Sequence, residues 1–363
     1  MEPLKELFNK KFYVEFAQEF YKVDKNFNPD KFVKQVTENL EILSLNQRMR
    51  NTSQVLKQHL PQDYKKAIDV LFKVIPNTKK GYTNLVFPDF VGLFGHDDNS
   101  TSLEALKYFT QFGSSEFAIR EFLKRDFVKT IKVINVWAKD KNHHVRRLAS
   151  EGSRPRLPWS FKLDEVIKNP KSTQTVLEIL KEDEELYVKK SVANHLNDLS
   201  KDNTNYMLHL ISGWSKNNVH TLWIIKHASR TLIKKGNIQS LALFNFEKKP
   251  KLKLENFKII NSKINLGDSL HFEFDITSEK LTTQKLVIDY CIHYRKKSGG
   301  HSLKIFKLKE FELKPNQIIK ISKKQLIKDF TTRKHYAGTH FVELQINGAV
   351  LNKLSFELNT INS

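Results

Sequence analysis

The sequence predicts a multidomain protein of the α-then-β class, in which a HEAT-like helical-repeat solenoid is followed by a small immunoglobulin-like β-sandwich. Three observations support this prediction. Apolar residues recur at helical spacing up to about residue 245, a motif returns after about forty residues within that part, and β-like alternation begins near residue 254. We therefore predict a helical domain over residues 1–246, a linker over 247–253 and a sandwich over 254–363.

In the first part, apolar residues stand three or four positions apart, as they do within residues 103–109 and 131–137. Short polar connectors separate these segments. Asn28-Pro29-Asp30 is a typical helix-start signal, because Asn caps a helix and Pro is tolerated in its first turn. This part is therefore predicted to be helical.

A loose repeat runs through the helical part. Val145–Ser150 resembles Val188–Ala193, which begins 43 positions later, and Trp223–Ala228 is a weaker copy. Helix pairs of about 40–47 residues are typical of HEAT-like stacking. Basic residues follow the first apolar position of each copy, so stacking would align them along one face. That face is either a groove for an anionic ligand or the solvated side of amphipathic helices, and the spacing favours neither.

After the linker, the chain contains runs with the residue types and alternation of β-strands. They lie at residues 257–260, 270–276, 286–294, 303–311 and 340–346. Asn265–Asp268, Lys297–Gly300 and Asn347-Gly348 mark turns. About seven strands in roughly 110 residues indicate an immunoglobulin-like sandwich.

The net charge of +21 predicts an anionic partner, with nucleic acid first and an anionic membrane surface second. A basic surface without a partner is the alternative. The charge is shared, since residues 246–363 hold 22 Lys/Arg and 12 Asp/Glu, a net of +10. No apolar run of about 18 residues and no secretory signal is present, so we expect a cytoplasmic protein that associates with the nucleoid when bound to DNA.

The single cysteine, Cys291, excludes an intramolecular disulfide and a multi-cysteine zinc site, and its apolar surroundings predict a core residue. The sequence has no His-Glu-x-x-His motif and no Gly-rich phosphate loop. The histidines lack a convincing zinc spacing. We therefore expect neither a metal nor a cofactor.

The stretch Ala149–Trp159 is the most unusual in the chain. Asn142 is a plausible N-cap for the helix before it, and Gly152 is a natural residue to end that helix. Glu151 then lies near the negative end of the helix dipole, which disfavours a carboxylate by about 0.3–1 kcal/mol. Either a salt bridge with Arg147, Arg154 or Arg156 or a catalytic role in a basic groove would explain it.

Trp159, Asp198 and Glu116 are three further candidate functional residues. Pro155 and Pro158 stiffen the loop that presents Trp159, which could stack on a base or fill a gap between repeats. Asp198 again lies near the end of a helix, either as a surface acid paired with a lysine or as a functional carboxylate. Glu116 follows two serines that can cap a helix, and an acid in a first turn needs no functional reason.

Four motifs make a resemblance to a known family specific. They are Asp89–Gly95, Phe109–Phe117, Val145–Trp159 and Val192–Asp198, with Leu45–Arg50 and Trp223–Ala228 in support. Together they cover most of residues 40–245 and resemble the AlkC-type DNA glycosylases. The C-terminal part is similar in kind only, because some members carry an immunoglobulin-like domain there.

The resemblance implies a monofunctional DNA glycosylase of base excision repair. Such an enzyme hydrolyses the N-glycosidic bond of cationic alkylated bases, notably 3-methyladenine and 3-methylcytosine, in duplex DNA. Glu116, Glu151 and Asp198 would be the acidic residues of the active site, and Trp159 would lie against the lesion nucleotide. The implied protein is a monomer that needs no cofactor and no obligate protein partner.

A physical mechanism fits this implication. Alkylation at N3 makes the base a good leaving group, so carboxylates need only stabilise an oxocarbenium-like sugar and orient water. We expect basic side chains to contact phosphate and make binding salt-dependent. The candidates are Arg147, Arg154, Arg156, Lys189, Lys190, Lys226 and Arg230.

Two other functions remain open from the sequence. A non-enzymatic HEAT-type nucleic-acid-binding scaffold would share the basic face but would not need Glu151 and Asp198. A protein-interaction solenoid would bind acidic peptides instead of DNA. The division of roles among the three acids is also open.

Overall fold

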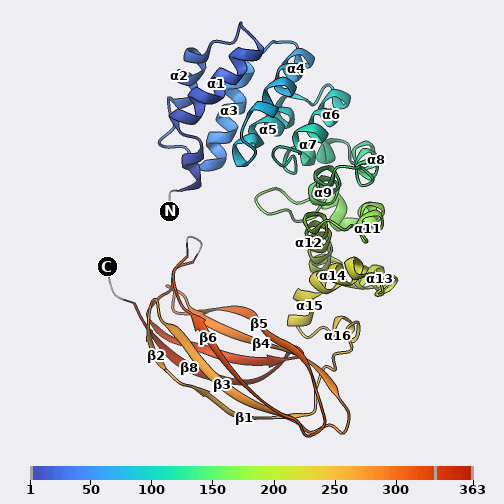
Figure 1. The fold of residues 1–363 in the computed structure, drawn as a ribbon, viewed down its shortest axis with the longest axis vertical. Coiled ribbons are helices and arrows are strands. Elements are labelled where there is room, and N and C mark those ends of the chain that lie inside the picture. The colour runs from blue at the N-terminus through green and yellow to red at the C-terminus, as the bar shows by residue number, and fades with distance from the viewer. Residues whose placement is uncertain (1–2, 331–332, 361–363) are drawn as a thin grey trace. The chain divides into compact units, whose positions relative to one another are not determined.

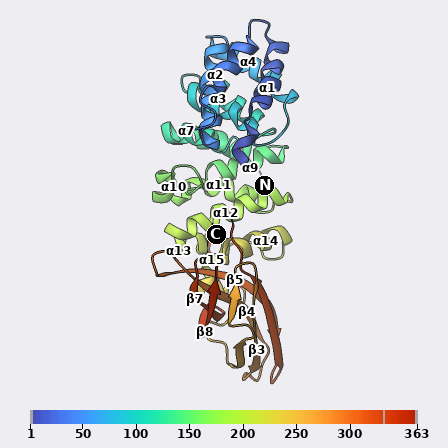
Figure 2. The same cartoon turned by 90° about the vertical axis from the view of Figure 1, so that its left-hand side faces the viewer.

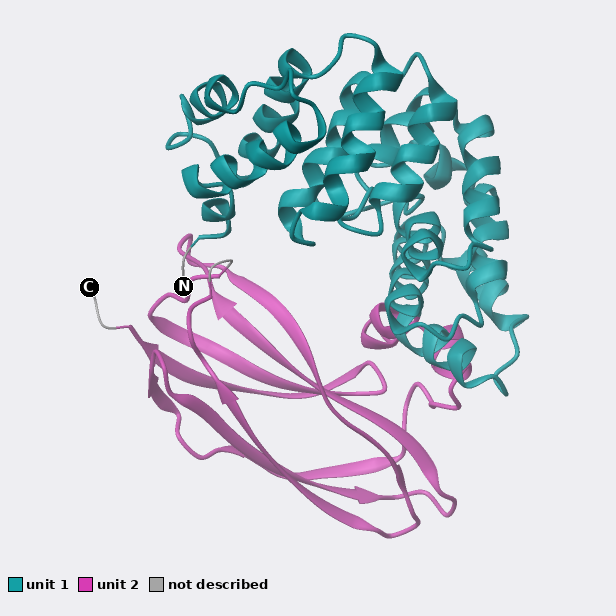
Figure 3. Ribbon diagram, turned by 45° about the horizontal axis from the view of Figure 1, so that its top comes forward, with its two compact units in different colours: residues 1–228 teal, residues 229–363 magenta. Residues whose placement is uncertain are grey.

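The computed structural model describes residues 3–330 and 333–360, and it forms two compact units (Figures 1 and 3). The first unit comprises residues 1–228 and the second residues 229–363. The first is helical and the second is built mainly of strands, so the predicted fold class is confirmed. Among the described residues, the longest helices are too short or too polar to cross a bilayer.

The helices of the first unit form a curved row (Figure 1). In chain order they are η1 (Leu4–Leu7), α1 (Lys10–Val23), α2 (Pro29–Thr37), α3 (Leu45–His59), α4 (Tyr64–Val74), η2 (Ile75–Asn77), η3 (Tyr82–Leu85), α5 (Val86–Phe94), α6 (Asn99–Phe109), α7 (Ala118–Arg125), α8 (Phe127–Trp137), α9 (His143–Gly152), α10 (Asp164–Lys168), η4 (Pro170–Thr173), α11 (Gln174–Leu180), α12 (Leu186–Asp202), α13 (Thr204–Ser212) and α14 (Val219–Ala228).

Local signals in the sequence set many of these helix starts. The side chain of Asn28 accepts a hydrogen bond from the Lys31 amide, with Pro29 in the first turn. Asn142 caps α9 in the same way, through the amide of His144 at 2.8 Å. Both predicted caps are therefore confirmed.

The repeat predicted from the sequence corresponds to three neighbouring helices. α9 packs against α12, and α12 packs against α14 (Figures 1 and 2). Val145 and Val188, the equivalent first apolar positions of two copies, are both buried. Equivalent positions of the repeat thus lie on the buried sides of stacked helices, as expected for HEAT-like packing.

Gly152 differs from its predicted role. The helix α9 continues through Gly152 and Ser153 is its C-cap, so this glycine does not end the helix in a left-handed conformation. A Cβ atom at Gly152 would lie 2.4 Å from Cγ2 of Ile119 on α7. The glycine is required because α7 and α9 approach closely just where the helix delivers Glu151.

The second unit begins with two short helices, α15 (Arg230–Lys234) and α16 (Ile238–Ala242). In the described part of this unit, eight strands follow: β1 (Leu252–Ile259), β2 (Lys263–Asn265), β3 (Ser269–Ser278), β4 (Gln284–Arg295), β5 (His301–Leu313), β6 (Ile318–Leu326), β7 (Gly338–Ile346) and β8 (Ala349–Asn359). One sheet has the order β1-β3-β6 and the other β2-β8-β7-β4-β5. Every pairing is antiparallel except β2 with β8.

The core of the second unit contains apolar residues from both sheets, such as Phe272 and Phe274 from β3 and Ile288 and Ile292 from β4. Four of the five predicted β-like runs lie wholly in strands, the run 257–260 extends one residue beyond the end of β1, and the sequence pattern missed β2, β6 and β8. Cys291 is buried as predicted, and burial raises the pKa of its thiol to about 12.

The units divide earlier than the sequence pattern predicts. The structure places α15 and α16 in the second unit, whereas the pattern predicts a helical domain up to residue 246. The reason is a set of contacts between α15 and the larger sheet. Lys234 Nζ donates to the carbonyl of Ile305 at 2.5 Å, and Gln345 Nε2 donates to the carbonyl of Lys234 at 2.6 Å.

Candidate active site

The structure brings together the three acids that the sequence singles out. Glu151 lies in the last turn of α9, Glu116 precedes α7, and Asp198 lies on α12. Two arginines connect them in a chain in which Arg147 joins Glu116 to Glu151 and Arg154 joins Glu151 to Asp198. Carboxylates from two helices and from the turn before α7 therefore form one largely buried array.

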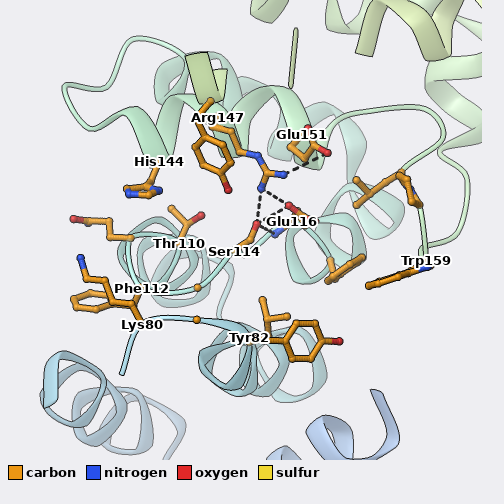
Figure 4. A pocket seen from close by; sticks show the side chains of 18 residues that line it. Lys80, Tyr82, Thr110, Phe112, Ser114, Glu116, His144, Arg147, Glu151 and Trp159 are labelled. Atoms are coloured by element: carbon orange, nitrogen blue, oxygen red, sulfur yellow. Dashed lines mark hydrogen bonds and ion pairs between the residues drawn. The ribbon is translucent and has the colours of Figure 1, made fainter. Parts of the chain in front are cut away.

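Arg147 occupies the first half of this array (Figure 4). Its Nη1 donates to Glu116 Oε2 and, at 2.8 Å, to Ser114 Oγ, while Nη2 lies 3.4 Å from Glu151 Oε1. Ser114 Oγ also donates to Glu116 Oε2 at 2.7 Å. The guanidinium lies 4.8 Å from the ring centroid of Tyr187. These contacts hold Arg147 between the two glutamates, with an aromatic ring over it.

Arg154 occupies the second half. Its Nη1 donates to Glu151 Oε1 at 2.6 Å and its Nε to Asp198 Oδ2 at 2.8 Å. Burial lowers the pKa of Arg154, but the charges of Glu151 and Asp198 outweigh that effect and leave the pKa raised. Lys201 donates to the other oxygen of Asp198 at 2.8 Å. Asp198 is thus fully engaged by two cations.

Glu151 has a third partner besides the two arginines. Ser191 Oγ on α12 donates to Glu151 Oε2 at 2.5 Å, and the residue is only 5% exposed. Of the three arginines that the sequence offers as partners, Arg156 is elsewhere and pairs with Asp202. Salt bridges with Arg147 and Arg154 therefore explain in part why a carboxylate is tolerated at the end of α9. Whether Glu151 can also act on a ligand depends on whether it faces a cavity.

A cavity of about 560 Å³ opens beside the array. Glu116, Arg147 and Glu151 form its charged wall, and Trp159 stands at its edge (Figure 4). Other lining residues are Phe112, from the motif Phe109–Phe117, and Lys80, Tyr82, His144 and Tyr187, which the sequence did not single out. Asp198 does not line it. The two glutamates therefore line the cavity, whereas Asp198 lies behind it and is joined to Glu151 through Arg154.

Trp159 is 76% exposed and has a φ of 65°. A large aromatic residue in the left-handed region is uncommon and strained. An exposed indole cannot fill a gap between repeats, so that interpretation of Trp159 is wrong. The loop instead holds a flat apolar surface in solvent at the mouth of the cavity.

Arg120 supports this loop and was not found from the sequence. It is fully buried on α7 and donates to the carbonyls of Gly152 at 3.1 Å, Arg154 at 2.6 Å and Phe161. Burial, followed by the charge of Arg154, lowers the pKa of its guanidinium to about 10, so it stays protonated at neutral pH. A charged residue among the apolar neighbours Ile119 and Phe122 was the available signal.

The comparisons with known proteins agree with this architecture. Residues 253–360 match the family model described as the C-terminal Ig-like domain of the uncharacterised protein YhaZ. Uncharacterized protein YhaZ of Bacillus subtilis is 39% identical over 99% of this chain and 100% of that protein. The structure of Pseudomonas fluorescens alkylpurine DNA glycosylase AlkC, bound to DNA containing an abasic site analogue, matches with a TM-score of 0.95 and 44% identity over 99% of this chain and 100% of that one. This chain belongs to the AlkC family of alkylpurine DNA glycosylases.

The cations predicted to contact phosphate differ in availability in this AlkC-family chain. Arg147 and Arg154 are held by the acids of the array, and Arg156 is held by Asp202. Lys189 Nζ lies 2.9 Å from His220 Nδ1. Lys190 and Arg230 have exposed side chains, Lys226 is exposed but also interacts within the protein, and Arg230 lies in the second unit. Their contact with DNA stays a prediction.

The histidines near the array have a structural role. His195 Nδ1 lies 3.1 Å from the carbonyl of Ser150, and its Nε2 lies 3.2 Å from Thr173 Oγ1. Burial, followed by the charge of Arg154, lowers the pKa of His195 to about 3, so it is neutral. Within residues 3–330 and 333–360, no three His, Cys, Asp or Glu side chains are grouped to bind a metal. His195 instead fixes the backbone next to Glu151.

Proposed function

We propose that this AlkC-family chain hydrolyses the N-glycosidic bond of cationic alkylated bases in duplex DNA, including 3-methyladenine and 3-methylcytosine. The observation that carries the proposal is the array itself, in which Glu116 and Glu151 are held by Arg147 at the wall of a cavity that Trp159 borders. The AlkC structure that it matches contains DNA with an abasic site analogue, the product side of such a reaction.

The chemistry follows from charge. A base methylated at N3 is cationic, so the bond from C1′ to the base breaks with the bonding electrons leaving on the base, which becomes neutral. The sugar then carries positive charge at C1′, and an anionic carboxylate nearby stabilises it. The oxygen of a water molecule bonds to C1′, and a carboxylate accepts the released proton.

We assign Glu151 and Glu116 to the sugar and the water, because both line the cavity and hydrogen bonds hold both in place. Asp198 is the third acid. It orients Arg154 in the structure described here, and its other partner, Lys201, is half-exposed. A phosphate group can compete for Lys201 and draw it away, which would leave one oxygen of Asp198 unpaired and strengthen the negative charge behind Glu151.

The test is base release from duplex DNA that carries 3-methyladenine or 3-methylcytosine. We expect the wild type to release the base and Glu151→Gln to lose at least two orders of magnitude in single-turnover rate while keeping its affinity for DNA. Glu104→Gln, an exposed glutamate on α6, is the matched control. Binding of damaged DNA with no release by the wild type would instead favour the non-enzymatic scaffold.

We also propose that the enzyme is monofunctional, meaning that it releases the base without cleaving the DNA strand. The carboxylate chemistry described above uses water, not an amine, as the nucleophile. Lys80 lines the cavity, and its Nζ lies 5.3 Å from the ring centroid of Phe112. A bifunctional enzyme would form a Schiff base between such a lysine and the sugar. In the same reactions, borohydride should therefore trap no covalent complex between protein and DNA, and a trapped complex that disappears in Lys80→Gln would contradict this part.

A further inference from the structure

A second hollow in the first unit adjoins the carboxylate cavity and has no part in the chemistry proposed above. Its volume is about 730 Å³, and α3, α5, α7 and the loop residues Trp159–Phe161 line it. We call it the amide hollow, after Asn46, Gln47, Asn51 and Gln54 on α3. Phe117 and Trp159 line both hollows. The two hollows are therefore neighbours that share these two aromatic side chains.

Two sequence motifs meet in the amide hollow. Leu45–Arg50 begins α3 and Asp89–Gly95 forms most of α5, and both were singled out in the sequence although neither supplies an acid of the array. Gly92 allows the close packing beneath the hollow, since a Cβ atom there would lie 3.2 Å from the Cβ of Ala118 on α7. Neither motif takes part in the glycosylase chemistry proposed above. Both contribute lining residues to the amide hollow, which would give them a function in binding a ligand.

The four amide side chains lie along one side of α3, because positions 46, 47, 51 and 54 recur at helical spacing. Internal hydrogen bonds use only part of their capacity. Asn46 Oδ1 accepts from the Tyr82 hydroxyl at 2.5 Å, and Asn51 Nδ2 donates to the carbonyl of Val36 at 3.2 Å. These bonds leave the amide group of Asn46 and the oxygen of Asn51 available, whereas Gln47 Oε1 accepts from the amide and hydroxyl of Ser44 in the helix cap. Gln54 is exposed at the same surface.

The charges of the amide hollow do not suit a phosphate. Its cations are Arg50 and Arg125 and its acids are Asp89 and Glu121, so the formal charges of the lining cancel. Arg50 Nη2 lies 2.9 Å from Asp89 Oδ1, and this ion pair already uses that cation. A ligand of this hollow should thus be uncharged, able to donate and accept hydrogen bonds, and flat enough to lie against Trp159.

We propose that the amide hollow binds an unpaired, uncharged nucleobase of the bound duplex. Asn and Gln side chains read the edges of bases through paired donors and acceptors, and aromatic rings stack on their faces. This inference rests on the proposed function, because a lesion held at the carboxylate cavity leaves a base without its pairing partner. That base is either the one opposite the lesion or one adjacent to it, and both have the same chemistry.

The test uses the full chain and duplexes that contain an uncharged tetrahydrofuran abasic analogue, which cannot be hydrolysed. The fluorescent base 2-aminopurine is placed opposite the analogue in one duplex and beside it on the same strand in another. We expect the wild type to change the emission at one of these positions, because stacking on Trp159 alters the fluorescence of the base. The position that responds identifies the source of the bound base.

Variants then connect the signal to the hollow. We expect Asn51→Ala/Gln54→Ala to lose most of the emission change and to bind the abasic duplex roughly tenfold more weakly, with unchanged affinity for undamaged duplex. Gln18→Ala, an exposed glutamine on α1, should behave as the wild type. Should the double variant not fold, Gln54→Ala alone gives the same comparison, because this side chain is on the surface.

The two proposals fail in different ways. The inference is overturned if the double variant and the wild type give the same emission at both positions and the same affinity for the abasic duplex. That result would leave base release by the wild type untouched. Conversely, a wild type that releases no base would contradict the proposed function, while the binding measurements would still show whether the amide hollow takes an unpaired base.

Discussion

At the scale of single residues, Arg120 fixes the loop that carries Trp159, because its guanidinium donates hydrogen bonds to backbone carbonyls of that loop. The three carbonyls belong to Gly152 and Arg154, at the start of the segment that presents Trp159, and to Phe161, at its end. A planar guanidinium can serve several acceptors in fixed directions, whereas an ammonium group is a compact point charge. Arg120 is therefore a positioning residue for the loop.

This role predicts the effect of Arg120→Lys. We expect the free energy of unfolding to fall by about 1–3 kcal/mol, because buried carbonyls lose donors. Single-turnover base release should slow more than the loss of stability explains, while affinity for undamaged duplex is kept. Denaturant unfolding and excision kinetics at a temperature where the variant is folded check both parts. Arg120→Met should be worse in both assays, and a lysine variant equal to the wild type would contradict this role.

The unusual role of a residue could be predicted from the sequence where a local rule applies to its position. The helix dipole disfavours Glu151 at its position, and that local cost already indicated an unusual role. The contact of Glu151 with Ser191 could not be predicted from the sequence. Ser191 lies 40 positions away and contacts Glu151 only because α9 and α12 are stacked. Arg120, which holds both ends of the loop that carries Trp159, is likewise connected to that loop by no local pattern.

At the scale of elements, the contact between α9 and α12 determines the position of Glu151. His195 on α12 holds the carbonyl of Ser150, and Ser191 on the same helix holds the carboxylate itself. Two hydrogen bonds from α12 thus hold two successive residues of α9. Because His195 is neutral and completely buried in the folded chain, this contact is sensitive to acid.

The expected pH dependence follows from the pKa of His195, which is about 3 in the folded chain and near 6.5 when exposed. Between these values the unfolded chain binds the extra proton, so stability falls as the pH falls. From pH 7 to pH 5 the contribution is about 2 kcal/mol. Urea unfolding at both pH values should show a smaller loss for His195→Gln than for the wild type. An equal loss in both proteins would mean that His195 is not buried in its neutral form.

Most helices and strands could be predicted from the sequence, because helix caps and apolar–polar alternation involve only residues close together in the chain. The strand β6 escaped prediction because it is rich in lysine and its inward residues are few, so its sequence resembles that of a loop. The strand β2 has only three residues and pairs with β8 in parallel, far along the chain. The early division of the units also depends on long-range contacts, namely those of Lys234 with Ile305 and Gln345.

For the whole molecule, the net charge of +21 predicts strongly salt-dependent binding of duplex DNA. Each phosphate contact contributes about one to the slope of log K against log salt concentration. Lys190 is exposed on α12, so Lys190→Gln should lower this slope by about one and weaken binding equally for damaged and undamaged DNA. Lys132→Gln, an exposed lysine on α8, is the control. Identical slopes for wild type and Lys190→Gln would remove Lys190 from the interface.

We propose that the carboxylate array stabilises a positively charged sugar. The most direct measurement compares the affinity of the protein for two duplexes, one with a pyrrolidine abasic analogue that is protonated at neutral pH and one with the uncharged tetrahydrofuran analogue. We predict that the wild type binds the cationic analogue at least roughly tenfold more tightly and that Glu151→Gln loses most of this preference. Equal affinity of the wild type for both duplexes would contradict the claim.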